Sequence, residues 1–418
     1  MTSPHPPKTP PGPSNPDTLL SNRPFLLFWT ARVFSAIAFQ VSAVAVGWQV
    51  YALTGSAFNL GMLGLVQFLP MVVLTLAAGH AADRYDRRAI VRACQAVMGC
   101  SALMLAMGNV YGWLHIAGIF SAVAVIGAAR SFEHPTMSAL LPGLVPDSLL
   151  PKAAALSSSA IQTAFIIGPA LGGFLYAAGP AAAYSMAALL FLSASLLTSF
   201  IRFDRVPPRW NSRDFRSLFS GIAFIRSRPE ILGAISLDLF AVLFGGATAL
   251  LPIFARDILH TGPWGLGVLR SAPSVGALAM SVFLARFPLE HRIGHLMFGA
   301  VIVFGLATIT FALSNSMLLS LGALVVLGAA DVISIVIRMT LVQLSTPDEM
   351  RGRVSAVNSL FVGTSNQLGE FESGVTAALL GTVPAVVVGG MGTIVVAILW
   401  MRLFPDLRRA DSFEGRKS

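Results

Sequence analysis

Twelve apolar runs, each about 20 residues long, constrain this chain more than any other feature of its sequence. A helix of that length crosses the ~30 Å hydrocarbon core of a bilayer, and it satisfies its own backbone hydrogen bonds there. Only 11% of the residues are charged, whereas a soluble domain carries about 25%. We therefore expect an all-α membrane protein with twelve transmembrane helices rather than an unusually apolar soluble enzyme. The runs begin near Phe25, Asn59, Ala89, Trp113, Ala153, Ala181, Ile231, Gly265, Ile293, Met317, Val354 and Val386.

The positions of the Lys and Arg residues predict the orientation of the chain. If the N-terminus is inside, 23 of the 28 lie in the tails or inward loops, and only Arg256 lies in an outward loop. Inward loops of membrane proteins carry the excess of Lys and Arg. We therefore expect both termini in the cytoplasm. The same placement explains the net charge of +9 without a nucleic-acid partner.

An internal repeat divides the chain into two similar halves. A shift of 201 residues aligns Pro146 with Pro347, Asp147 with Asp348, Gly168 with Gly369 and Gly173 with Gly374. A shift of 203 residues aligns Gly64 with Gly267 and Pro70 with Pro273. Each repeat holds six spans, an even number, so the halves are parallel repeats about an axis along the membrane normal. In such proteins the substrate site lies near the midplane between the halves.

The spans and the repeat predict five segments. The first 18 residues are Pro-rich and contain no apolar core, so we expect a disordered tail rather than a signal peptide. Between the halves, five apolar residues recur at helical spacing, which favours an amphipathic helix on the inner leaflet over a solvated linker. These residues are Phe215, Leu218, Phe219, Ile222 and Ile225. The segments are a cytoplasmic tail (1–18), a six-helix bundle (19–204), a cytoplasmic linker with the amphipathic helix (205–229), a second six-helix bundle (230–405) and a cytoplasmic tail (406–418).

The charged stretch "GHAADRYDRR", residues 79–88, falls on the inward loop after the second span. It resembles the signature of the major facilitator superfamily, Gly-x-Leu-Ala-Asp-Arg-x-Gly-Arg-Arg/Lys. Ala81 replaces the usual Leu, and Asp86 replaces the second Gly, which puts a side chain in a tight turn. The matching residues are Gly79, Ala82, Asp83, Arg84, Arg87 and Arg88.

The resemblance extends from about Asn22 to Arg402 and is nearest to the bacterial branch that includes enterobactin exporters. "ARVFSAIAFQ", "IGPALGGFL" and "TPDEMRGRVSAVNS" carry it. It implies the major facilitator fold, with two parallel-related six-helix bundles, in a bacterial inner membrane. The "GPALGG" stretch resembles a helix-5 motif associated with export by antiport, although Gly-Pro pairs also occur as ordinary kinks. Its residues are Gly168, Pro169, Gly172 and Gly173.

These observations predict a secondary transporter that works by alternating access, most simply a monomer in membrane lipid. The resemblance implies proton-coupled export of a small amphipathic molecule, such as a siderophore or a drug. An importer and a lipid flippase are alternatives on the same fold, and a non-transporting membrane sensor is an alternative of another class. The sequence has no G-x-x-x-x-G-K-[ST] loop, so we expect no ATP-driven pumping. We expect no enzyme activity, cofactor or metal, since His291 and His295 have metal spacing but no third ligand.

The signature also predicts a gate between the halves. Asp83 ends the second helix, opposite the start of the eleventh, and a helix N-terminus carries about half a positive charge. With Arg351 and Arg353 nearby, Asp83 is expected to form a latch that closes the cytoplasmic side. In the alternative, these arginines, with Arg84 and Arg87, only fix the topology.

Charged and polar residues inside the spans are the candidates for the transport site. A charge near the bilayer centre costs about 3 kcal/mol and marks function by default, although paired charges also serve only to hold helices together. The candidates for the substrate cavity are Arg32, Gln40, Arg130, Glu133, Arg270, Asp331, Arg338, Asn358 and Asn366. Glu372 and Asp238 are the first candidates for proton coupling, and Glu370 is the third.

Three relations among these residues follow from the helix geometry. Glu372 belongs to a polar stripe that faces protein or cavity, and Glu370 points to the opposite side of its helix. Arg270 is at a depth where it can pair with one of these glutamates. The repeat carries Arg130 to Asp331, so we expect those two to meet when the inner side closes. Asp238 has no obvious partner at its depth, and burial without a partner favours the protonated acid.

Overall fold

The computed structural model describes residue 19, residues 22–201 and residues 215–411. Within these ranges the chain is helical and contains no strand. The predicted tail over residues 1–18, residues 205–214 of the predicted linker and residues 412–418 of the second tail lie outside the described residues.

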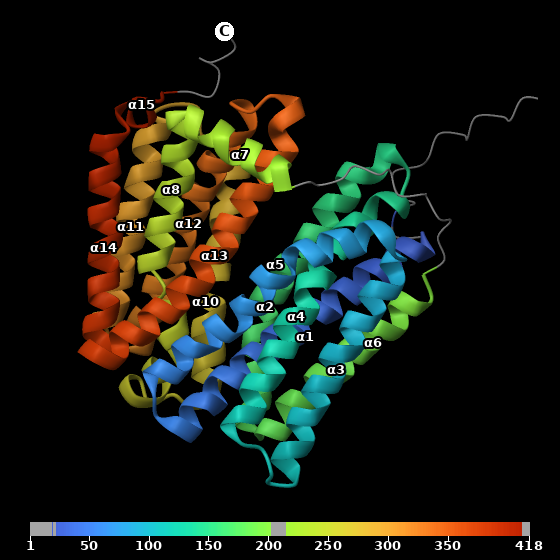
Figure 1. Cartoon of the computed structure of the whole chain (residues 1–418). Helices are drawn as coiled ribbons and strands as arrows, with labels where there is room; N and C mark the ends of the chain where they lie inside the picture. The colour runs from blue at the N-terminus through green and yellow to red at the C-terminus, as the bar shows by residue number, and fades with distance from the viewer. Residues whose placement is uncertain (1–18, 20–21, 202–214, 412–418) are drawn as a thin grey trace, which may run out of the picture.

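Two six-helix bundles make up the fold, one from each repeat (Figure 1). The first contains α1 (Arg23–Thr54), α2 (Ala57–Arg84), α3 (Arg87–Val110), α4 (Ile116–Leu140), α5 (Leu150–Ala177) and α6 (Pro180–Ser199). The second contains α8 (Pro229–Phe244), α10 (Gly262–Arg286), α11 (Ile293–Leu313), α12 (Met317–Leu344), α13 (Asp348–Leu380) and α14 (Thr382–Leu403). After α8 the same span continues through η4 (Ala247–Leu250), α9 (Leu251–Ile253) and the π-helical turn η5 (Phe254–Ile258).

The predicted twelve-helix fold agrees with these helices. Eleven segments of the described chain are long and apolar enough to cross a membrane. The twelfth long helix is α13, which has 33 residues and the most polar sequence of the twelve. Its polar positions include Asn358, Glu370 and Glu372, the residues that made this helix a candidate for the transport site.

The bundles approach each other at one end and diverge at the other (Figure 1). We call the end that carries α7 (Phe215–Ser227) and α15 (Pro405–Arg408) the inner end, because it is the end expected to face the cytoplasm. The helices that contact each other most between the bundles are α5 with α10 and α2 with α13. These two crossings hold the bundles together towards the outer end.

Paired glycines form both crossings. A Cβ on Gly173 of α5 would lie 2.9 Å from the Cα of Gly267 in α10. A Cβ on Gly61 of α2 would lie 2.8 Å from the Cα of Gly374 in α13. The repeat equates Gly173 with Gly374 and Gly267 with Gly64, which lies one turn from Gly61 in α2. The two crossings therefore join corresponding helices of the two halves. Only glycine lets the backbones approach this closely.

Two short helices pack on the inner end of the second bundle. In α7, Ile225 is buried with Val354 and Val357 of α13, and Ile222 is 36% exposed. The side chains of Phe215, Leu218 and Phe219 lie outside the described residues. In α15, Leu407 is buried in the core of the bundle. The described part of the second predicted tail therefore packs against the bundle.

Candidate functional site

A cavity of about 120 Å³ opens among α1, α4 and α5 of the first bundle, and we call it the arginine cavity. It collects four of the predicted cavity residues, Arg32, Gln40, Arg130 and Glu133. The apolar part of its wall is formed by Ala36, Phe39, Met137, Ile161, Ala164 and Phe165. The arginine cavity thus combines a buried carboxylate and two half-buried guanidinium groups with an apolar surface.

Neutral donors hold the Glu133 carboxylate on the floor of this cavity. Ser35 donates its hydroxyl to Glu133 Oε1 at 2.5 Å, and Gln95 donates its amide to the same oxygen at 3.1 Å. Thr198 of α6 donates to Gln95 Oε1 at 2.9 Å and orients that amide. Sequence reasoning missed Ser35, Gln95 and Thr198, although single polar residues within apolar runs are the signal that marks such a network.

The guanidinium groups of the two arginines in the cavity lie over aromatic rings. The Arg130 guanidinium lies 3.6 Å from the centroid of the Phe39 ring, and that of Arg32 lies 5.9 Å from the Phe28 ring. The Nε atom of Arg32 is buried without a hydrogen-bond partner among the described residues. Within the described chain, neither arginine forms an ion pair with a carboxylate.

In the second bundle, Asp238 of α8 and Arg338 of α12 form a buried ion pair. The expectation that Asp238 has no partner at its depth is therefore wrong. Asp238 lies nine residues from the inner end of α8 and Arg338 six residues from the inner end of α12. Their depths are therefore similar, but depth alone does not reveal that α8 and α12 are neighbours. Asp331 and Ser334 line a small cavity with Asp238. Arg130 and Asp331 thus line separate cavities in this structure.

A further cavity of about 70 Å³ lies between the bundles, and we call it the interbundle cavity. Arg270 of α10 and Glu370 of α13 line it together with Gln67 of α2. Glu370 is therefore the glutamate that shares a site with Arg270. A Cβ on Gly64 of α2 would lie 2.9 Å from the Glu370 Cβ, so this acid sits at the contact between the halves.

Glu372 occupies the opposite side of α13, within the second bundle. Its Oε1 accepts a hydrogen bond from Thr376 at 2.8 Å. On the same stripe, a Cβ on Gly369 would lie 3.0 Å from backbone oxygens of α8. The stripe thus faces protein, and Glu372 belongs to the interior of one bundle rather than to the interface. Asn358 on this stripe is buried, whereas Asn366 is exposed.

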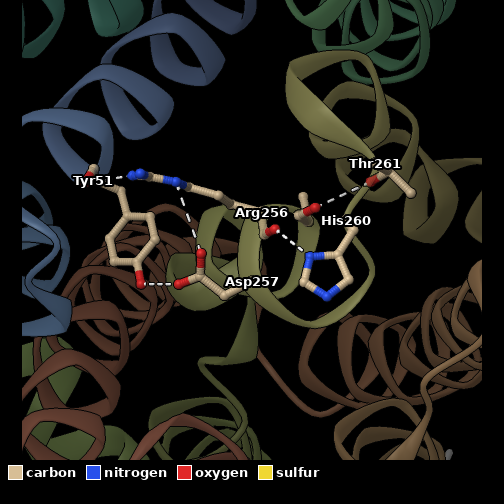
Figure 2. Close-up of polar contacts among 6 residues, drawn as sticks. Tyr51, Arg256, Asp257, His260 and Thr261 are labelled. Atoms are coloured by element: carbon tan, nitrogen blue, oxygen red, sulfur yellow. Dashed lines mark hydrogen bonds and ion pairs between the residues drawn. The ribbon is translucent and has the colours of Figure 1, made fainter.

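A polar cluster joins the bundles at the outer end (Figure 2). The Tyr51 hydroxyl of α1 donates a hydrogen bond to the Asp257 carboxylate of η5. Arg256 pairs with Asp257 at 3.8 Å and donates to the Tyr51 carbonyl at 3.3 Å. His260 Nδ1 lies 3.2 Å from the Arg256 carbonyl. Sequence reasoning used Arg256 only for topology; its position as the single basic residue of the outward loops was the available signal.

The signature stretch ties together the inner ends of the first bundle. Arg87 Nη1 donates to the Ala139 carbonyl in the last turn of α4 at 2.9 Å, and Arg88 Nη1 donates to the Ile201 carbonyl after α6 at 2.8 Å. Cations are favourable at these helix ends, where carbonyls lack partners. Asp86, where the family pattern has Gly, caps α3, since its Oδ1 accepts from the Arg88 backbone N–H at 3.0 Å.

The predicted latch lies partly outside the described residues, because the Asp83 side chain is not among them. Arg84, Arg351 and Arg353 are exposed. Arg353 Nη1 lies 3.3 Å from the Ser220 hydroxyl of α7, so this arginine binds the linker helix. In α2, no atom of the described residues lies within 4 Å of a Cβ position on Gly79.

The helix-5 motif positions α5 against two helices. A Cβ on Gly168 would lie 2.6 Å from the Gln40 Cβ, and one on Gly172 would lie 2.9 Å from the Val41 Cα, both in α1. Gly173 makes the crossing with α10 described above, and Pro169 lies inside α5. The motif thus supports both the wall of the arginine cavity and the contact between the bundles.

His291 lies 3.8 Å from Asp411. In the part of the chain that the structure describes, no three His, Cys, Asp or Glu residues form a cluster that could hold a metal ion.

Comparison with known proteins identifies the family of this chain. The family model described as "Transmembrane secretion effector" (MFS_3) matches residues 15–416. The chain belongs to this family of the major facilitator superfamily. It is a membrane transporter of the major facilitator type and not an enzyme.

Proteins similar in sequence carry the name of an exporter. The chain is 27% identical over 395 residues to the enterobactin exporter EntS of Citrobacter koseri, with 94% of each chain covered. It is 25% identical to EntS of Salmonella choleraesuis, with 94% of this chain and 95% of the relative covered. The expected resemblance to this branch is confirmed.

Solved structures confirm the fold. The nucleoside transporter NupG, as a D323A mutant, superposes with a TM-score of 0.71 at 14% identity and covers 91% of this chain and 100% of its own. A bacterial homologue of the human lysosomal transporter Spinster, in an inward-facing and unoccupied conformation, gives a TM-score of 0.71 at 12% identity and covers 93% and 96%. These similarities apply to the fold alone.

Proposed function

We propose that this transporter exports a small amphipathic molecule from the bacterial cytoplasm across the inner membrane and that proton antiport drives the export. The observation that carries the proposal is the arrangement of charges between two bundles that meet at the outer end. The arginine cavity lies in one bundle, and the Arg270–Glu370 site lies at the interface between them. A rocking motion of the bundles would expose these groups to each side in turn.

Export is favoured over import by two features. The relatives similar over 94% of the chain are named enterobactin exporters, and the helix-5 glycine motif resembles a motif of antiporters. The cargo is accordingly a siderophore or another molecule with both a polar and an apolar part. Glu370 is the leading candidate for proton coupling because it lies at the contact between the bundles beside Arg270.

Vesicles of known orientation test the direction and the coupling. Inverted vesicles are loaded at acidic internal pH and given radiolabelled enterobactin or ethidium outside. We expect accumulation of one of the two cargoes, and we expect an uncoupler to abolish it. Accumulation in right-side-out vesicles only would contradict export.

A variant separates coupling from binding. Glu370→Gln is expected to lose gradient-driven accumulation and to keep exchange of labelled for unlabelled cargo, since exchange needs no net proton movement. Glu349→Gln, at an exposed acid near the start of the same helix, is the matched control. Full gradient-driven transport by Glu370→Gln would exclude Glu370 from the coupling.

A further inference from the structure

The arginine cavity holds more positive than negative charge. Arg32 and Arg130 contribute two guanidinium groups, and Glu133 contributes the one carboxylate among the lining residues. His134 also lines the cavity. Because a histidine side chain is either neutral or positive, it does not reduce the excess of positive charge. Both arginines are half-buried, and a positive surplus that is partly withdrawn from water is stabilised when an anion pairs with it. The cavity is therefore suited to an anion.

The existing contacts leave the guanidinium groups available. Glu133 is already bound by Ser35 and Gln95, so its carboxylate is oriented by neutral groups and not by either arginine. Arg130 is fixed by the Phe39 ring, which contacts the face of the guanidinium and leaves its N–H groups at the edge. The Nε–H of Arg32 is buried without an acceptor among the described residues. Donors arranged in this way suit an oxyanion, which accepts two parallel hydrogen bonds from an arginine.

The second bundle does not offer the same chemistry. Arg338 is already neutralised by Asp238, and Asp331 adds a further carboxylate beside them. At the interface, Glu370 shares the cavity of Arg270. Among the three cavities described, only the arginine cavity carries a positive surplus.

We propose that Arg32 and Arg130 bind the oxyanion of an amphipathic cargo (a carboxylate, sulfonate or phosphate), with the apolar part of the cargo against Phe39, Met137 and Phe165. The apolar lining residues follow α5 from Ile161 to Phe165, and Phe165 is 44% exposed. An apolar group thus has a path along this wall. The inference rests on the proposed function, because it names the class of molecule that the transporter carries.

Binding to the purified full-length protein in phosphatidylcholine nanodiscs tests the inference. The ligands are matched in shape: 2-naphthoate and 2-naphthalenesulfonate as anions, 2-naphthylmethylammonium as the cation and 2-naphthylmethanol as the neutral compound. At pH 7.5 we expect both anions to bind at least tenfold more tightly than the cation. Equal or tighter binding of the cation would overturn the proposal.

Two variants are expected to weaken the binding of naphthoate, and a third is expected to strengthen it. Arg130→Gln and Arg32→Gln are each expected to weaken naphthoate binding about ten- to hundredfold, the range for a lost hydrogen bond between charged groups. Their binding of 2-naphthylmethanol should persist, which shows that the cavity is still folded. Glu133→Gln removes the opposing charge and should tighten naphthoate binding several-fold, a gain that misfolding cannot produce. Unchanged naphthoate affinity in all three variants would refute the site.

Arg92→Gln, at an exposed arginine of α3, is the matched control and should bind as the unaltered protein does. Nanodiscs that contain phosphatidylglycerol distinguish a lipid headgroup from a soluble anion. Competition by this lipid would support the oxyanion site and identify its occupant as a phospholipid. If vesicles transport a cargo but the purified protein binds naphthoate no more tightly than the cation, the proposed anion site is refuted and the export proposal stands.

Discussion

At the scale of single residues, the sequence identifies the charges but not their partners. Arg32, Arg130 and Glu133 are recognised as candidates because they interrupt apolar runs, and the structure brings them into one cavity. The Asp238–Arg338 pair escapes prediction, because 100 residues separate its members and only the packing of α8 with α12 joins them. Neutral partners such as Gln95 escape prediction for another reason, since a lone amide carries no charge that demands a counter-ion.

The Asp238–Arg338 pair leads to a prediction about stability. Arg338→Leu leaves Asp238 buried without its partner, and removal of one member of a buried pair costs about 3–5 kcal/mol. We expect that loss in the unfolding free energy, measured in mixed dodecyl maltoside and dodecyl sulfate micelles. Adding Asp238→Asn should recover at least half of it. Arg286→Leu at an exposed position is the control; a loss no larger than in this control would show that the pair does not stabilise the fold.

At the scale of helices, the sequence predicts the positions of the elements better than it predicts the partners of single residues. Apolar runs locate the helices, and the repeat correctly relates Gly173 to Gly374 because glycines at a backbone crossing cannot be replaced without moving a helix. The sequence does not predict the turn η5 or its contact with Tyr51, because a π-helical turn has no periodic signal. Nor does it predict that Asp86 serves as a helix cap, since the family pattern has Gly there.

The glycine crossing predicts a shift in conformation. The added methyl of Gly173→Ala would lie 2.9 Å from the Gly267 Cα. An overpacking cost of about 1.4 kcal/mol in the state with a closed outer end would shift the equilibrium towards the state with an open outer end about tenfold. We expect a cysteine at Ser42, in the interbundle cavity, to react about tenfold faster with a maleimide added from the outer side. The background replaces Cys94 and Cys100 with Ser. Gly299→Ala is the matched control, since its methyl meets nothing within 4 Å; equal rates in both variants would rule out the crossing as the outer closure.

At the scale of the whole molecule, duplication explains the architecture. Two similar bundles give two crossings between corresponding helices. In the proposed alternating-access cycle, the interface between the bundles opens at one end while it closes at the other. Composition predicts the membrane helices, because the bilayer requires apolar runs of that length, and the internal repeat predicts their division into two groups. They do not predict which end is apart, because the two states of the proposed alternating-access cycle would share one sequence and differ only in free energy.

The central claim is that the bundles rock about the membrane midplane, and distance measurements between spin labels test it most directly. Labels at Ser148 and Arg286 report on the inner ends of the two bundles, and labels at Ala178 and Asn315 report on the outer ends. When cargo and a proton gradient are applied to the reconstituted protein, we predict that the inner distances shorten while the outer distances lengthen. Inner and outer distances that stay fixed, or that change in the same direction, would contradict alternating access in this protein.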